Sequence, residues 1–265
     1  MAIDVAAGSA GFEMGRVISR TFRVIADNAP VFLALTTLLC LPAIIYSQFS
    51  IIAGLFGYHV TTPVGLGGLG AIYAQIAIGY AISFIFANLL EAAITHGTIV
   101  SLNGGKASFG ECLSTAISNI LPLLAIVLIA TIAILLGFVV LIVPGVILML
   151  MLCVPVQVRV TEHKGIMESL SRSAELTKGY KGQIFGLLVI YFVVIIVIEL
   201  LMRPLTGVAM IARAGEATTI PYVGVAMLVQ IVFSLLNAVG TTSIYYELRL
   251  VKEGVGPEQL AAVFA

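Results

Sequence analysis

The sequence predicts an all-α polytopic membrane protein with six transmembrane helices, arranged as three hairpins that are each preceded by an interfacial amphipathic helix. Of the 265 residues, 60% are hydrophobic and only 10% are charged, whereas roughly 25% are charged in a typical soluble domain. Several apolar stretches reach the roughly 20 residues that a helix needs to cross a bilayer. Between them lie short segments in which polar and apolar residues alternate at helical spacing. Together these observations predict a single integral membrane domain over residues 1–265.

The first amphipathic segment covers residues 12–27. Its polar positions follow steps of three and four, and they are Glu13, Arg16, Arg20, Arg23 and Asp27. The opposite face is apolar and consists of Met14, Val17, Ile18, Phe22 and Ile25. We expect a helix in the membrane interface with its cations toward head groups. It runs into a first span from Pro30 to about Phe49, and the uncharged loop that follows indicates the outer side.

The second span runs from about Leu69 to about Val100, which exceeds one crossing of roughly 20 residues, so we expect it to tilt or to extend beyond the bilayer. Glu91 and His96 lie in its last third. An ionisable group at bilayer depth costs about 2.5 to 3.5 kcal/mol, which makes Glu91 a candidate functional residue. The competing interpretation is that the span ends near the interface and leaves Glu91 close to water.

A weaker amphipathic segment, residues 109–119, precedes the third and fourth spans. These spans are expected at about 121–143 and 144–158. Pro144 and Gly145 are expected to break the helix between them and so to form a tight hairpin. Pro155 is expected to kink the fourth span because proline removes one helical hydrogen bond.

The stretch that follows the fourth span shows a membrane span continuing into a second basic amphipathic helix. No charge occurs between Gly145 and Val158, and charges then cluster from Arg159 to Lys181. Four of them are spaced by four, three and three residues, namely Glu168, Arg172, Glu175 and Lys178. The other face holds Ile166, Met167, Leu170, Ala174 and Thr177. This pattern favours an interfacial helix, and the alternative is a cytoplasmic helix packed on a neighbour.

The fifth and sixth spans are expected at about 184–202 and 222–245. Glu199 and Arg203 are spaced i, i+4 at the end of the fifth span, where they can neutralise each other. Glu199 is therefore an intramembrane polar candidate whose favoured interpretation is a self-satisfied pair. Tyr245 and Tyr246 suit an interfacial aromatic belt.

The distribution of Lys and Arg between the two sides of the predicted spans indicates how the protein is oriented in the membrane. Only Arg203 and Arg213 fall on one side, while the other side carries Arg16, Arg20, Arg23, Lys106, Arg159, Lys164, Arg172, Lys178, Lys181, Arg249 and Lys252. Lys and Arg are enriched in cytoplasmic loops, so the bias predicts that both termini are cytoplasmic.

An internal repeat accounts for this layout. The unit is an interfacial helix followed by two spans, and it occurs at about 11–103, 107–160 and 165–250. Short identities support it: Ser19-Arg20-Thr21 matches Ser171-Arg172-Ser173, and Glu111, Leu113 and Ser114 match Glu168, Leu170 and Ser171. Repeated order of elements is stronger evidence than these identities, which amphipathic helices can share by chance.

The sequence offers no clear catalytic or cofactor chemistry. Each of the three histidines, His59, His96 and His163, stands alone without a metal-ligand spacing. Cys40, Cys112 and Cys153 are far apart, and no nucleophile motif or phosphate loop is present. The sequence therefore predicts a protein that is not an enzyme and needs no cofactor or metal. A formal net charge of zero argues against nucleic acid as a partner.

Part of the chain resembles a known bacterial family. The residues that carry the resemblance are Pro144-Gly145, Pro155, Glu162, the run from Ser169 to Phe185, and Tyr246-Glu247-Leu248-Arg249. They look like the membrane domain attached to some glycerophosphodiester phosphodiesterases and like its stand-alone six-span relatives, many of them uncharacterised inner-membrane proteins. In fused members a separate soluble domain performs the hydrolysis. The resemblance thus implies a multi-pass protein of the bacterial inner membrane without catalytic residues of its own.

Two functional hypotheses follow. In the first, the protein is a scaffold that binds anionic lipid head groups, or a membrane or cytoplasmic protein partner, through Arg16, Arg20, Arg23, Arg172, Lys178 and Lys181. In the second, it is a small-molecule or ion transporter or channel whose path is lined by Glu91, Gln75, Asn88, Gln230 and Asn237. The sequence favours the scaffold, because it lacks the broken-helix pairs of many transporters. It leaves the oligomeric state open.

Overall fold

The computed structural model describes residues 11–47, 66–211 and 219–254. Within these ranges the regular secondary structure is entirely helical. The helices are α1 (Met14–Asp27), α2 (Ala29–Ser47), α4 (Leu66–Leu102), α5 (Phe109–Ser118), α6 (Ile120–Val140), α7 (Ile142–Met151), α8 (Pro155–Glu162), α9 (Ile166–Thr177), α10 (Lys181–Ile211) and α11 (Thr219–Glu253). The all-helical class predicted from sequence is confirmed for this part of the chain.

Six segments of the described chain are long and apolar enough to cross a membrane. They are Ala29–Tyr46, Leu69–Leu102, Ile120–Val140, Ile142–Glu162, Lys181–Ile198 and Met227–Glu253. Each corresponds to one of the six predicted spans. The predicted second span is one continuous helix of 37 residues, α4, which at about 1.5 Å per residue exceeds the thickness of a hydrocarbon core.

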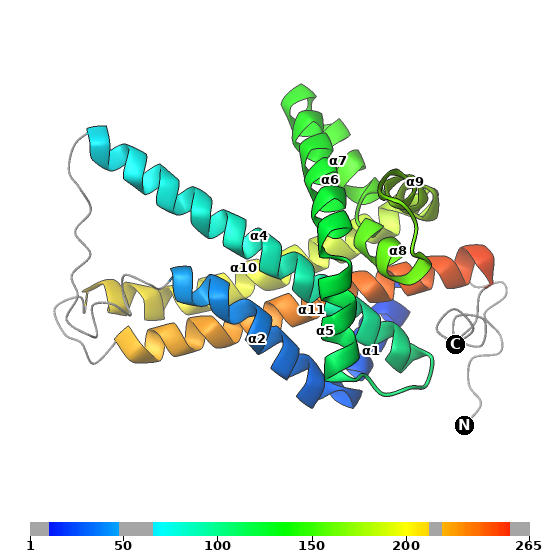
Figure 1. The fold of residues 1–265 in the computed structure, drawn as a ribbon, viewed down its shortest axis with the longest axis horizontal. Helices are drawn as coiled ribbons and strands as arrows, with labels where there is room; N and C mark the ends of the chain where they lie inside the picture. The colour runs from blue at the N-terminus through cyan, green and yellow to red at the C-terminus, as the bar shows by residue number, and fades with distance from the viewer. Residues whose placement is uncertain (1–10, 48–65, 212–218, 255–265) are drawn as a thin grey trace.

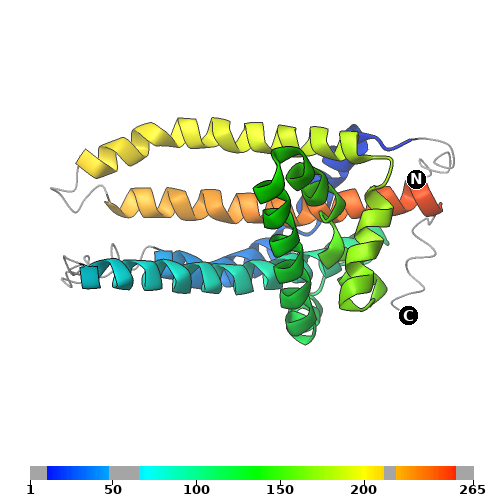
Figure 2. The ribbon, with the colours of Figure 1, turned by 90° about the horizontal axis from the view of Figure 1, so that it is seen from above.

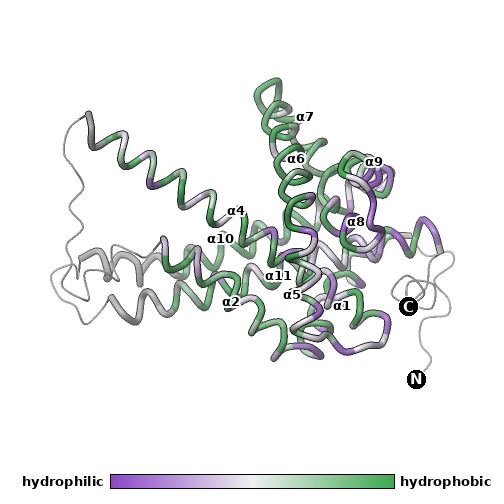
Figure 3. The backbone as a smooth tube through the Cα atoms, viewed as in Figure 1, coloured by the Kyte–Doolittle hydropathy of each residue, from purple (hydrophilic) through white to green (hydrophobic). Residues whose placement is uncertain are grey.

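The long helices form two groups. In Figure 2, α2, α4, α10 and α11 extend along the long axis of the view, and Figure 1 shows that α2 and α4 are inclined to α10 and α11. Figure 1 shows that α6 and α7 lie together and project away from this group, and the two helices pack closely on each other. Figure 3 shows hydrophilic segments gathered over α8, α9, α1 and the C-terminal end of α11, while the projecting helices are mostly hydrophobic. The protein therefore has one charged end, on which α1 and the end of α11 meet.

The turn between α6 and α7 lies at Leu141, three residues before the predicted break at Pro144. Leu141 is extended, with φ −163° and ψ 153°, and it separates the two helices. Pro144 lies inside the first turn of α7 and does not break the helix, because the backbone N–H that proline lacks has no partner in a first turn. Gly137 and Gly145 permit the close packing, since a Cβ on Gly137 would lie only 3.0 Å from the Cα of Gly145.

The fourth predicted span is divided into two helices by the segment around Pro155. α7 ends at Met151 and α8 begins at Pro155, so proline starts a helix and does not merely kink one. Ser173 of α9 supplies hydrogen bonds at this break. Its hydroxyl donates to the carbonyl of Met151 at 2.8 Å and accepts from the backbone N–H of Val154 at 3.3 Å. Where a membrane helix is broken, Ser and Thr hydroxyls of neighbouring helices commonly form hydrogen bonds with the backbone groups that have lost their helical partners.

The buried core lies near the charged end. One group of buried side chains joins α2, α4 and α11, and includes Phe32, Leu35, Ile94 and Leu235. A second group joins α8, α9, α10 and the end of α11. The remaining surface of the long helices is apolar and exposed; Val139 of α6, for example, is 82% exposed. Such surfaces suit contact with lipid chains, which are as apolar as the side chains themselves.

Candidate functional site

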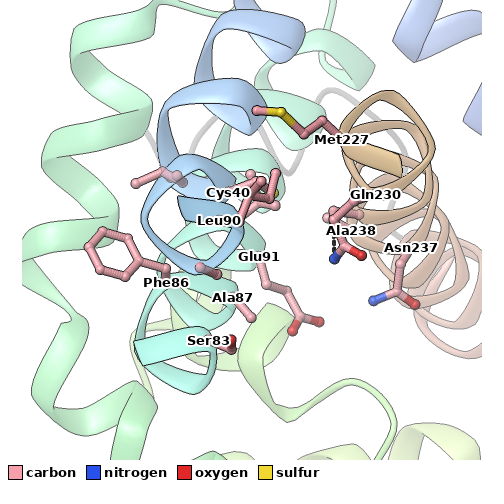
Figure 4. A pocket seen from close by; sticks show the side chains of 14 residues that line it. Cys40, Ser83, Phe86, Ala87, Leu90, Glu91, Met227, Gln230, Asn237 and Ala238 are labelled. Carbon is pink, nitrogen blue, oxygen red and sulfur yellow. Dashed lines mark hydrogen bonds between the residues drawn. The ribbon is translucent and has the colours of Figure 1, made fainter. Parts of the chain in front are cut away.

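A cavity of about 400 Å³ lies between α2, α4 and α11. Its volume falls within the range of roughly 300 to 1,000 Å³ that is usual for ligand pockets. One part of the lining is apolar and includes Leu39, Ile44, Phe86, Leu90 and Met227. The other part is polar and consists of Ser83, Glu91, Gln230, Ser234 and Asn237. Figure 4 shows Glu91 extending from α4 toward α11, on which Gln230 and Asn237 lie. The cavity is therefore amphipathic.

Most of the polar wall is a stripe along α11. Gln230, Ser234, Asn237 and Thr241 occur at spacings of four, three and four residues, which places them on one face of the helix. Gln230 donates from Nε2 to the Ser234 hydroxyl at 3.4 Å. The side chains of Gln230 and Asn237 are exposed. A polar face on a helix that is apolar enough to cross a membrane suits a polar ligand, water or another polar surface, because unpaired polar groups in hydrocarbon are costly.

Glu91 is held at the end of this stripe by neutral donors. Its Oε1 accepts a hydrogen bond from Gln157 Nε2 at 2.9 Å and one from the Thr241 hydroxyl at 3.4 Å. Gln157 Nε2 also donates to Thr241 at 3.0 Å, and the Gln157 side chain is fully buried. In the described part of the chain, no Lys or Arg forms an ion pair with Glu91. The carboxylate thus faces the cavity without a cation beside it.

The structure brings together some of the predicted path residues and separates others. Glu91, Gln230 and Asn237 line the same cavity. Asn88 is buried and donates to the Phe84 carbonyl one turn earlier at 2.6 Å, and Gln75 is exposed away from the cavity on α4. Gln157, Ser234 and Thr241 were not identified from the sequence. The helical spacing of Ser234 and Thr241 with Gln230 was the available signal, whereas nothing near Gln157 indicated its contact with Glu91.

The other two intramembrane candidates lie apart from the cavity. His96 is half-buried in α4, and the cavity lining does not include it. Glu199 lies within α10, but its side chain is outside the part of the chain that the structure describes. The same holds for Arg203, so the predicted pair between them stays a prediction.

Two of the predicted lipid-contacting arginines point into the protein. Arg16 donates from Nε and Nη2 to Glu247 Oε1 at 2.9 and 2.6 Å, and Arg20 donates from Nη1 to Glu247 Oε2 at 2.9 Å. The Glu247 side chain is 0% exposed. The Arg20 guanidinium also lies 4.7 Å from the centre of the Tyr246 ring. These contacts hold α1 against the end of α11.

Arg172 is part of a second ion-pair network at the charged end. Its Nε lies 3.3 Å from Glu162 Oε2, and its guanidinium also contacts Glu253 of α11. Glu162 accepts a hydrogen bond from the Tyr245 hydroxyl at 3.0 Å. Both Tyr245 and Tyr246 are buried inside the protein, so the aromatic belt predicted for them is wrong. The matched arginines of the repeat, Arg20 and Arg172, both pair with carboxylates near the end of α11.

The remaining three predicted lipid contacts are oriented differently. Arg23 and Lys178 are exposed, and Lys181 is half-buried. None of the three forms an ion pair with the described residues. The lipid contact of all six cations stays a prediction, and these three are the ones whose charge is not offset by a neighbouring carboxylate.

The described residues hold no group of His, Cys, Asp and Glu side chains that could bind a metal ion. The cysteines Cys40, Cys112 and Cys153 are free thiols. Burial, with a smaller contribution from the negative charge of Glu111, raises the pKa of the Cys112 thiol to about 11. This thiol is therefore protonated at neutral pH, and a thiol in that form is a poor nucleophile.

Comparison of the chain with protein-family models, with curated proteins and with solved structures found no match. The cavity and the charged end are therefore the observations from which a function can be argued.

Proposed function

We propose that this chain is a non-enzymatic, multi-pass membrane protein that binds an amphipathic molecule from the bilayer in the cavity between α2, α4 and α11. The class of ligand is a lipid or a lipid-like molecule. The observation that carries this proposal is the division of the cavity lining into an apolar part, mostly from α2 and α4, and a polar part, mostly from α11. Ligand sites typically combine a mostly apolar lining with a few placed polar groups.

The charged end is proposed to lie at the cytoplasmic surface of the bacterial inner membrane, with both termini on that side and the helices paired as three hairpins. In this arrangement α1 and α9 lie in the interface. Met14, Ile18 and Phe22 recur at steps of four on the exposed side of α1, where they suit contact with acyl chains. Arg23, Lys178 and Lys181 suit contact with anionic head groups. The resemblance to the membrane domain of glycerophosphodiester phosphodiesterases is consistent with this role.

Reporter fusions test the proposed orientation. Fusions after Gly68 and after Gly215 are expected to report the outer side, and fusions at the C-terminus are expected to report the cytoplasm, because Lys and Arg are concentrated on the other side of the spans. Alkaline phosphatase and green fluorescent protein give opposite signals across the membrane. An outer C-terminus would contradict the six-span orientation.

A cavity-filling substitution tests the binding site. Ala87 is an exposed side chain on the cavity wall, and Ala87→Phe is expected to reduce lipid retained by the purified protein several-fold because the ring occupies the site. Ala81→Phe is the matched control, since Ala81 is also exposed on α4 but does not line the cavity. Native mass spectrometry in mild detergent measures retained lipid. Equal retention in both variants would show that the cavity is not the binding site.

Transport of a small molecule or an ion is a second candidate function, and the convergence of Glu91, Gln230 and Asn237 favours it. Polar residues within membrane spans commonly face a substrate path. Flux into vesicles that contain the purified protein distinguishes transport from binding, because a binding protein retains its ligand without moving it across the membrane.

A further inference from the structure

We infer that the ligand of the cavity carries a cationic nitrogen, an ammonium group on an apolar tail, which pairs with the Glu91 carboxylate. This inference rests on the proposed binding function and adds the charge of the ligand to it. It follows from the partners of Glu91, from the direction in which its side chain extends and from the composition of the walls around it.

The described partners of Glu91 leave half of its carboxylate available. Gln157 and Thr241 both donate to Oε1, and no described residue donates to Oε2. A carboxylate has roughly four acceptor positions, so two donors on one oxygen do not satisfy it. Both donors are neutral, and they cannot offset the negative charge. The vacant oxygen can therefore accept the hydrogen bonds of an ammonium group.

The fixed orientation of the carboxylate also suits a cationic ligand. Gln157 is fully buried in α8. The Thr241 hydroxyl lies 3.0 and 3.1 Å from the carbonyl oxygens of Asn237 and Ala238 in its own helix, so its single proton is shared between these carbonyls and Glu91. Gln157 is the main donor that holds Oε1 from the protein side, and Thr241 contributes less. Figure 4 shows the Glu91 carboxylate in the space between α4 and α11. A ligand in the cavity thus meets an acceptor that is already positioned.

The apolar lining of the cavity indicates that the rest of the ligand, beyond its ammonium group, is apolar. Phe86 and Leu90 precede Glu91 on the cavity face of α4, and Leu39 and Ile44 of α2 add to the apolar wall. An alkyl chain can lie along this wall while its ammonium group reaches Glu91. Among the described residues that line the cavity there is no Lys, Arg or His, so no cationic side chain is present to pair with an anionic ligand.

Binding of dodecylamine tests the inference. Tritiated dodecylamine, which is an ammonium ion at neutral pH, is incubated with the immobilised full chain in neutral maltoside detergent, and bound label is measured by scintillation proximity. Unlabelled competitors separate the contributions of charge and tail: dodecylamine carries both, dodecanol the tail alone and ethanolamine the ammonium group without an alkyl tail. We expect dodecylamine to compete at least about tenfold better than either of the others, because each lacks one half of the interaction.

Three variants complete the test. Glu91→Gln removes the charge at nearly constant volume and is expected to weaken dodecylamine binding at least about tenfold, while dodecanol binding is unchanged. Ala87→Phe is expected to abolish binding of both, and Ala81→Phe to leave both intact. Equal competition by dodecanol in the parent protein would overturn the inference, and so would unchanged dodecylamine binding in a folded Glu91→Gln protein. If Ala87→Phe has no effect on either probe, the proposed binding site itself is wrong.

Discussion

Replacing Glu247 by alanine is expected to lower the free energy of unfolding by about 3 to 5 kcal/mol, the range observed when one partner of a buried ion pair is removed. Glu247 accepts three hydrogen bonds from Arg16 and Arg20, and its side chain is 0% exposed. Without it, two guanidinium groups that are mostly buried lose their carboxylate. α1 is then expected to detach from α11 before the spans unfold, because these contacts connect the two helices.

Glu13 provides the matched control. It also lies within ion-pair distance of Arg16, at 3.3 Å, but its side chain is 60% exposed. Glu13→Ala is expected to cost less than about 1 kcal/mol, since water screens an exposed pair. Thermal unfolding of the purified protein in detergent compares the two variants, and proteolysis between α1 and α2 measures detachment of α1. Equal stability of the two variants would contradict the structural role of Glu247.

The helices of this protein could largely be predicted from its sequence because the bilayer imposes simple rules. A span must be apolar over a roughly fixed length, so six stretches were identified, and the structure has a suitable segment at each. The break near Leu141 was misplaced by a few residues. Proline at position 144 was interpreted as a helix breaker, although a proline in the first turn of a helix is compatible with that helix.

The direction in which the amphipathic helices face could not be predicted. Helical spacing shows that Arg16 and Arg20 share one stripe, but it does not show what that stripe faces. In the structure the stripe turns toward Glu247, which lies 231 and 227 residues away along the chain. α9 shows the same limit. Its buried residues include Ser169, Ser173 and Thr177, whose hydroxyls bond to backbone carbonyls, while the apolar Met167 is exposed.

The candidate cavity was predicted in part. Glu91, Gln230 and Asn237 were recognised as polar residues within apolar stretches, which is a property of the sequence alone. Gln157 lies next to the first charges after a span, so the sequence gives it no special environment. Its contact with Glu91 depends on the packing of α8 against α4. Long-range packing of this kind cannot be read from local spacing.

The second prediction of large effect concerns Gly97, at the contact of α4 with α2 and α5. A Cβ added there would lie 2.7 Å from Cε1 of Phe32, 3.0 Å from Sγ of Cys112 and 3.2 Å from Cβ of Ala107. Real Cβ atoms essentially never approach other atoms as closely as the first of these distances, and all three neighbours are buried. Gly97→Leu is therefore expected to cost about 3 kcal/mol or more, at the upper end of the usual range for overpacked cores.

Gly70→Leu is the control for this substitution. Gly70 lies in the same helix, and nothing lies within 4 Å of a Cβ built on it. Leucine there is expected to leave stability unchanged or to raise it by up to about 1 kcal/mol, because glycine is the poorer helix former. Thermal unfolding in detergent measures both variants. Because Phe32 belongs to α2, a leucine at position 97 displaces α2 from α4, the two helices that form the apolar wall of the cavity. Gly97→Leu protein that still folds is thus expected to bind dodecylamine more weakly than the parent, whereas full binding would show that the cavity does not depend on this contact.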